Sequence, residues 1–137
     1  MILSIKVSAA ILALSVAAAH AQGAPPCPGN ADALGTARLL DVDAATTPRV
    51  GRKQFPQTLP LAPKEVVLTF DDGPWPATTE RVLDALRREC VRATFFLIGR
   101  NAAARPALAQ RELSEGHTVG YHSFSHPMLD RMPIEAA

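Results

Sequence analysis

The chain has 137 residues, of which 47% are apolar, and this size and composition suit one folded domain or part of one. Its formal net charge is +1, with 14 basic and 13 acidic residues and no block of Lys and Arg. Because a nucleic-acid binder gathers positive charge on one face or in one segment, we expect no nucleic-acid partner.

The first residues have the pattern of a secretory signal peptide. Lys6 and the amino terminus precede the apolar run 7–19, and Ala19-His20-Ala21 places small residues where a signal peptidase requires them. An uncleaved membrane anchor is the alternative, but the run is shorter than the roughly 20 residues that a spanning helix needs. We predict a signal peptide over 1–21, a secreted or periplasmic protein, and no membrane span after cleavage.

Two cysteines follow this segment, Cys27 and Cys90. Export would bring them into an oxidising compartment, where disulfides form. Cys27 lies in a stretch rich in Pro and Gly, however, and Cys90 ends a predicted helix. The sequence leaves their pairing open, and we favour one unpaired thiol in the arm and one small core residue.

Residues 22–62 are typical of a linker or N-terminal arm, because they are rich in Pro, Gly and Ala and their prolines prevent a long helix. We expect the domain to occupy residues 63–137. Its first element is a strand over 65–70, an apolar and β-branched run that suits burial on both faces. The Asp-Asp-Gly-Pro stretch at 71–74 would end this strand.

A helix is expected after this turn. Thr78 or Thr79 would cap it, and apolar residues recur at helical spacing between Val82 and Cys90. The apolar run 93–98 then predicts a second buried strand.

A second helix is expected after Gly99, with Pro106 in its first turn and Gly116 as a left-handed stop. Residues 118–121 form a third, shorter strand, and Pro133 would open a third helix. The alternation of strands and helices predicts an α/β fold with about three parallel strands joined by right-handed crossovers.

Two polar clusters follow predicted strands: Thr-Phe-Asp-Asp-Gly-Pro at 69–74 and His-Ser-Phe-Ser-His-Pro at 122–127. In parallel α/β folds and barrels, the carboxyl ends of the strands form the active face. The first and third strands would therefore deliver both clusters to one edge of the sheet.

The second cluster places His122 and His126 four positions apart, so a tight loop would aim both imidazoles at a common point. With a carboxylate from Asp71 or Asp72 they form a ligand set for zinc or a similar divalent ion. A fourth position would hold water, whose pKa such an ion lowers towards about 7. The free aspartate could then act as general base, an arrangement that suits hydrolysis of an amide or ester.

Each piece also has a purely structural interpretation. The stretch 71–74 is a natural turn, and a histidine pair at this spacing is often exposed or hydrogen-bonded. Trp75 suits a sugar-stacking platform or a cover for a barrel rim equally well. We expect His117 to be an exposed loop residue and His20 to leave with the signal peptide. The complementary ligand types at one sheet edge favour the metal site.

The same motifs resemble those of the polysaccharide deacetylases that share the NodB homology domain. The stretch 69–74 is similar to their first motif, and His-Ser-x-x-His at 122–126 to their second. Between these motifs, 92–99 resembles the family's second strand and 116–120 the approach to the second motif. The resemblance covers about residues 62–134, and two motifs in the right order are more specific than either alone.

The resemblance implies a distorted (β/α) barrel and a metal-dependent deacetylase of acetylated polysaccharides or chitooligosaccharides. Carried over by position, Asp71 would be the general base, and Asp72, His122 and His126 would hold the metal. Zinc is the expected ion, with cobalt, nickel or manganese as alternatives. Ser123 would steady the loop between the histidines. The expected partner is a carbohydrate, and the sugar and the oligomeric state stay open.

The family's later motifs have no counterpart after Pro133: one carries an arginine with an aromatic, one an aspartate with a tryptophan, and one a leucine with a histidine. We therefore expect residues 63–137 to be the N-terminal part of such a domain, an incomplete barrel with weak or no activity. A non-catalytic fragment that binds metal or carbohydrate is the alternative. A phosphatase-like hydrolase that uses the aspartate pair is a third hypothesis.

Overall fold

The computed structural model describes only part of the chain. The predicted signal peptide lies outside the described residues, and no helix within them is long and apolar enough to cross a membrane. The described residues are 27–43, 45–51, 53, 55–133 and 135.

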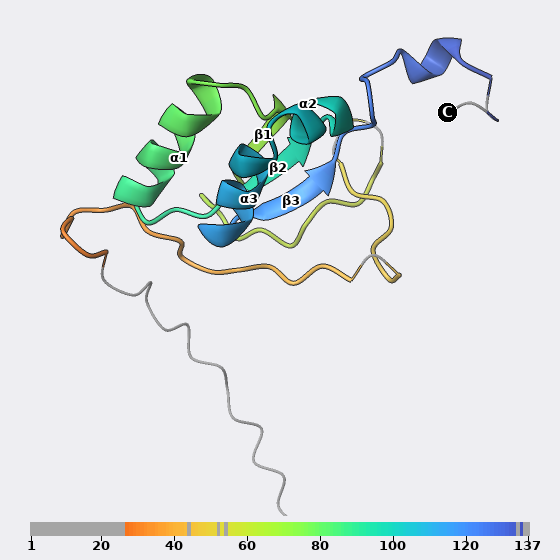
Figure 1. The fold of residues 1–137 in the computed structure, drawn as a ribbon. Helices are drawn as coiled ribbons and strands as arrows, with labels where there is room; N and C mark the ends of the chain where they lie inside the picture. The colour runs from red at the N-terminus through yellow and green to blue at the C-terminus, as the bar shows by residue number, and fades with distance from the viewer. Residues whose placement is uncertain (1–26, 44, 52, 54, 134, 136–137) are drawn as a thin grey trace, which may run out of the picture.

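Strands and helices alternate as the sequence predicts. Their order is β1 (Thr69–Gly73), α1 (Thr78–Arg88), β2 (Thr94–Leu97), α2 (Gly99–Ala104), α3 (Pro106–Ser114), β3 (Thr118–Tyr121) and the 3₁₀ turn η1 (Leu129–Arg131). The sheet order is β1-β2-β3, and both pairings are parallel. The three arrows in Figure 1 therefore point the same way, and their carboxyl ends meet at one edge. This confirms the predicted α/β class.

The core lies on one face of this open sheet. Phe95 and Leu97 of β2 are buried and alternate with half-buried neighbours, so the strand is not buried equally on both faces. All three helices contribute apolar side chains to the same cluster, which places them on one side of the strands. The cluster is Leu83, Leu86, Ala93, Phe95 and Leu97, with Phe70, Val82, Val91, Ala102, Ala109 and Val119 packed against it.

The first strand begins later than the sequence indicates. β1 starts at Thr69, which is aligned with the first residue of β2, Thr94. Residues 65–68 lie before the paired strand, although the Leu68 carbonyl accepts the Thr94 N–H at 3.0 Å, and Val66 is 79% exposed. The ladder also continues through Gly73, so the aspartates lie within the strand. The prediction of a strand over 65–70 buried on both faces is wrong, because β1 is an edge strand of an open sheet.

The helices also differ in detail from the prediction. Neither threonine caps α1, because Ala77 is at the N-cap position and the buried Thr79 hydroxyl accepts the Trp75 N–H at 2.8 Å instead. The expected second helix is two helices that meet at Arg105, and Pro106 begins α3. The expected helix after Pro133 runs into residues outside the described part of the chain.

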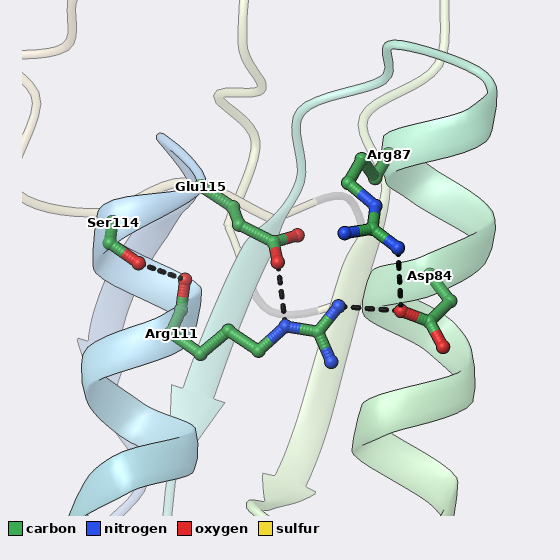
Figure 2. A network of polar contacts seen from close by, with 5 residues as sticks. All are labelled: Asp84, Arg87, Arg111, Ser114 and Glu115. Atoms are coloured by element: carbon green, nitrogen blue, oxygen red, sulfur yellow. Dashed lines mark hydrogen bonds and ion pairs between the residues drawn. The ribbon is translucent and has the colours of Figure 1, made fainter.

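Arg111 joins α3 to α1 (Figure 2). Its Nη2 lies 2.6 Å from Asp84 Oδ1, and its Nε lies 2.6 Å from Glu115 Oε1. Arg87 adds a longer contact to Asp84 at 3.3 Å, and the Ser114 hydroxyl donates to the Arg111 carbonyl. The hydrogen bond from Arg111 lowers the pKa of Asp84. Since both side chains are partly exposed, this network orients α1 against α3 more than it stabilises the fold.

Cys27 and Cys90 form a disulfide whose Cα atoms are 5.7 Å apart, so the prediction of two unpaired cysteines is wrong. The orange segment of Figure 1 shows why, since the arm starts beside the C-terminal end of α1. Asn30 Nδ2 donates to the Arg88 carbonyl at 2.9 Å. This contact joins a helix end to residues far away in the sequence, a proximity that local patterns do not encode.

Thr36 completes this attachment of the arm. Its hydroxyl donates to the Cys90 carbonyl at 3.3 Å and accepts the Arg92 N–H at 2.7 Å. Further along, the Arg38 guanidinium makes two contacts with the Glu65 carboxylate, at 2.8 and 2.7 Å. The arm is therefore part of the folded unit and not a detached linker.

His117 is buried, which contradicts the expectation of an exposed loop residue. Its Nδ1 accepts the Ala93 N–H at 3.2 Å, and its ring lies edge-on to Phe95 with centroids 5.2 Å apart. Burial lowers the pKa of His117 and so favours the neutral ring. His117 lies in the connection between α3 and β3, next to the start of β2. There its ring supplies the acceptor for the Ala93 N–H.

Glu112 of α3 is fully buried, and neither of its carboxyl oxygens has a hydrogen-bond partner among the described residues. Burial raises its pKa to about 7 from an ordinary value of 4.5. The cost of burying a charged carboxylate is the cause, so the folded chain keeps this group protonated over a wider pH range than the unfolded chain does.

Removing the disulfide should destabilise the fold by ~2–4 kcal/mol, because the unfolded chain would lose a constraint on a long loop. Cys27→Ser should therefore unfold at a lower denaturant concentration than the parent chain. Denaturant titrations with and without reductant measure this difference. Reductant should have no effect on the variant, and equal midpoints for oxidised parent and variant would contradict the prediction.

Glu112→Gln should change how stability depends on pH. Between about pH 4.5 and 7 the unfolded chain loses this proton while the folded chain keeps it, so the parent loses stability as pH rises through that window. Relative to the parent, the Gln variant should gain on the order of 3 kcal/mol of folding stability across the window. Denaturant titrations at several pH values measure this difference curve. Glu80→Gln, at an exposed position, controls for the loss of one carboxyl, and a flat curve for Glu112→Gln would contradict the prediction.

Candidate metal centre

The carboxyl edge of the sheet brings together one carboxylate and two imidazoles. Asp72 lies near the end of β1, and His122 and His126 follow β3. The Nε2 atoms of His122 and His126 each lie 3.3 Å from Asp72 Oδ1. One ligand atom from each of the three residues lies within 4.8 Å of the other two. The carboxylate and the histidine pair that the sequence singled out therefore share one site.

This geometry suits one divalent cation. Ligand atoms at about 2.0–2.1 Å from a tetrahedral zinc ion are about 3.4 Å apart. The two 3.3 Å separations match that spacing and exceed the roughly 2.7–2.9 Å of a charge-assisted hydrogen bond. Two imidazoles with one carboxylate also form a donor set that suits zinc and its neighbours among the transition metals. The residues present therefore fit the ion that the sequence predicts.

An irregularity in β1 positions Asp72. The register of β1 against β2 shifts between Asp71 and Gly73, and Asp72 has a φ of 69°. The buried Asn101 of α2 donates from Nδ2 to the Asp72 carbonyl at 3.0 Å. Ile98 N–H donates to the Gly73 carbonyl at 3.0 Å. The bulge breaks the strict alternation of the strand and so allows Asp72 to face the histidines.

The histidine loop is held by its own serine. Ser123 and His126 have φ values of 58° and 57°, in the left-handed region that few residues other than glycine adopt. The Ser123 hydroxyl accepts the His126 N–H at 2.9 Å, which agrees with the steadying role expected of it. The His122 N–H donates to the Leu97 carbonyl at 2.9 Å and so ties the start of the loop to β2.

The first turn of α2 supports the same loop. Gly99 N–H donates to the Ser123 carbonyl at 3.0 Å, and Arg100 N–H donates to the Phe124 carbonyl at 2.9 Å. A Cβ at position 99 would lie 2.8 Å from a ring carbon of Phe124 and 3.2 Å from its Cα. Gly99 is therefore the residue that this close approach requires. The sequence analysis did not identify Asn101 or the loop contacts of Gly99. The local signal for Asn101 was its position as a polar residue in the first turn of a helix.

The site is open to solvent. The side chains of Asp72 and His126 are 55% and 52% exposed, and that of His122 is 34% exposed. Asp71 is exposed as well and does not belong to the three-residue group. Trp75, in the loop after β1, is 48% exposed, and the Arg105 guanidinium lies 5.5 Å from the centroid of its ring.

Comparison with known proteins agrees with this fold. The sequence profile described as polysaccharide deacetylase matches residues 59–136. The chain is 52% identical over 72 residues to the peptidoglycan-N-acetylglucosamine deacetylase PgdA of Listeria monocytogenes. The aligned region covers 53% of this chain and 16% of that relative. It is 50% identical over 68 residues to a chitooligosaccharide deacetylase of Bradyrhizobium, covering 50% of this chain and 31% of that one.

Among solved structures, the Bc1960 peptidoglycan N-acetylglucosamine deacetylase superposes with a TM-score of 0.52 and 46% identity, over 53% of this chain and 34% of that one. The three parallel strands with helices on one face therefore match part of the (β/α) barrel fold of these deacetylases. The chain belongs to the polysaccharide deacetylase family. It spans 16% and 31% of the two relatives' lengths.

The three-residue group should bind zinc with one ion per chain. Asp72→Asn and His122→Ala should each weaken binding by more than about 100-fold, because each removes a direct ligand. Calorimetric titration with zinc chloride measures both affinity and stoichiometry. Asp71→Asn serves as the matched control, since it removes the neighbouring carboxylate and should leave the affinity close to that of the parent. Unchanged binding by Asp72→Asn would sink this assignment.

Proposed function

We propose that the chain carries the metal-binding part of a hydrolase that removes acetyl groups from an N-acetylated or O-acetylated polysaccharide or oligosaccharide. The observation that carries this proposal is the convergence of Asp72, His122 and His126 at the carboxyl edge of the sheet. Membership of the polysaccharide deacetylase family supports it, as do relatives named as deacetylases of peptidoglycan and of chitooligosaccharides.

In this proposal Asp72, His122 and His126 hold a divalent cation. Zinc is the proposed ion, and cobalt, nickel and manganese are the alternatives that the same donors accept. When bound, such an ion acts as a Lewis acid that polarises the acetyl carbonyl and offsets the negative charge that develops on its oxygen. The exposed positions of the three ligands leave this region accessible to a bulky glycan.

Asp71 is the proposed general base. It is the neighbour of Asp72, exposed, and outside the ligand group, so its carboxylate is free to accept a proton. It would take the proton of the attacking water as that water adds to the acetyl carbon. The bond between the acetyl carbon and the sugar nitrogen or oxygen then breaks, the proton held by Asp71 passes to that departing atom, and acetate leaves.

We also propose that the protein is exported. The Cys27–Cys90 disulfide supports this, because disulfides persist in oxidising compartments and are rare in the cytosol. The proposed signal peptide over 1–21 provides the route, and a glycan of the cell wall or its surroundings would then be within reach. In this view residues 22–62 form the arm and residues 63–137 the deacetylase-like unit.

A non-catalytic role in binding metal or carbohydrate is the second candidate. The openness of the site favours it, because solvent at an exposed centre weakens the electrostatic stabilisation on which catalysis depends. For the same reason we expect slow turnover from the 137-residue chain itself.

Asp71→Asn should slow acetate release strongly while zinc binding persists. The substitution keeps the size of the side chain and removes the proton acceptor, so the rate should fall by a factor of about 10²–10⁴. Acetate release from N-acetylated chitooligosaccharides, with zinc added in excess, is the measurement. Arg88→Ala, at the far end of α1, controls for a general surface change. Zinc binding without acetate release from the parent chain would favour the non-catalytic role.

A further inference from the structure

Trp75 is the exposed aromatic side chain closest in sequence to the metal ligand Asp72. The indole is large and only partly covered, and 48% of this residue is accessible. The Arg105 guanidinium lies over its ring at 5.5 Å, within the range of a cation–π contact. The pair therefore presents an apolar ring and a cluster of cationic N–H donors on one surface.

The backbone holds this pair in place before any ligand arrives. Trp75 lies between Pro74 and Pro76, which restrict the chain, and its N–H donates to the buried Thr79 hydroxyl at 2.8 Å. Arg105 lies at the junction of α2 and α3, where its N–H donates to the Ala102 carbonyl. Because both backbones are fixed, a ligand would pay little ordering entropy to bind here.

Both residues lie near the candidate metal centre. The three residues from Asp72 to Trp75 span at most about 11 Å. Arg105 follows Asn101 by one turn of α2, and the Asn101 side chain donates to the Asp72 carbonyl at 3.0 Å. A sugar next to the one whose acetyl group reaches the metal centre would therefore meet this surface.

We propose that Trp75 and Arg105 form a subsite for a sugar that carries a carboxylate, next to the acetylated sugar at the metal centre. The indole stacks on the apolar face of the sugar ring, and the guanidinium binds the carboxylate with paired N–H donors. The subsite rests on the proposed function and narrows its substrate to anionic glycan strands in preference to neutral chitooligosaccharides.

Binding to two tetrasaccharides tests the subsite. One is neutral and fully N-acetylated, and the other carries a lactyl ether carboxylate on alternate sugars. Calorimetric titration in an Asp72→Asn background removes turnover from the measurement, and asparagine tolerates the left-handed backbone at that position. The variants are Trp75→Ala, Arg105→Ala, Arg105→Lys and the charge-matched control Arg88→Ala. Thermal melts confirm that each variant is folded.

The Asp72→Asn chain should bind the anionic glycan more tightly, and Arg105→Ala should weaken that binding about tenfold while changing the neutral ligand little. Trp75→Ala should weaken both ligands, Arg105→Lys should recover part of the preference, and Arg88→Ala should change neither. Equal affinity for the two glycans, or equal losses from Arg105→Ala, would overturn the subsite. The binding titrations involve no turnover. A failure to release acetate would therefore count against the proposed function but would not change the result for the subsite.

Discussion

Helix α2 contacts both segments that supply the proposed metal ligands, the end of β1 and the loop after β3. The Asn101 side chain donates to the Asp72 carbonyl on one side. The N–H groups of Gly99 and Arg100 donate to the histidine loop on the other. The distances between the carboxylate and the imidazoles therefore depend on one short helix, which is itself fixed by the parallel pairing of β2 with both neighbours.

Three of the six non-glycine residues with a positive φ among the described residues lie at this site. Asp72, Ser123 and His126 all adopt positive φ values, which cost on the order of 1 kcal/mol or more for residues with a side chain. Hydrogen bonds from Asn101 and to the Ser123 hydroxyl offset part of this cost. Such strain is tolerated where the surrounding structure determines it and where function requires it.

The contacts that attach the arm and the candidate metal centre lie at opposite ends of the sheet. The Cys27–Cys90 disulfide and the Thr36 contacts attach the arm near the amino ends of the strands, where α1 ends and β2 begins. Asp72 and the histidines lie at the carboxyl ends. This division is the usual one in barrels built from parallel strands, in which loops at one end carry ligands and the other end holds the fold.

The sequence alone predicted the alternation of strands and helices, and it singled out the aspartates and histidines from which the candidate site is drawn. It did so because apolar periodicity is local, and because parallel strands bring their carboxyl ends to the same edge. Only the tertiary structure decided that Cys27 meets Cys90, that His117 and Glu112 are buried, and that Asn101 supports Asp72. Each of these depends on which distant segments lie side by side, a property of the packed chain that no local pattern encodes.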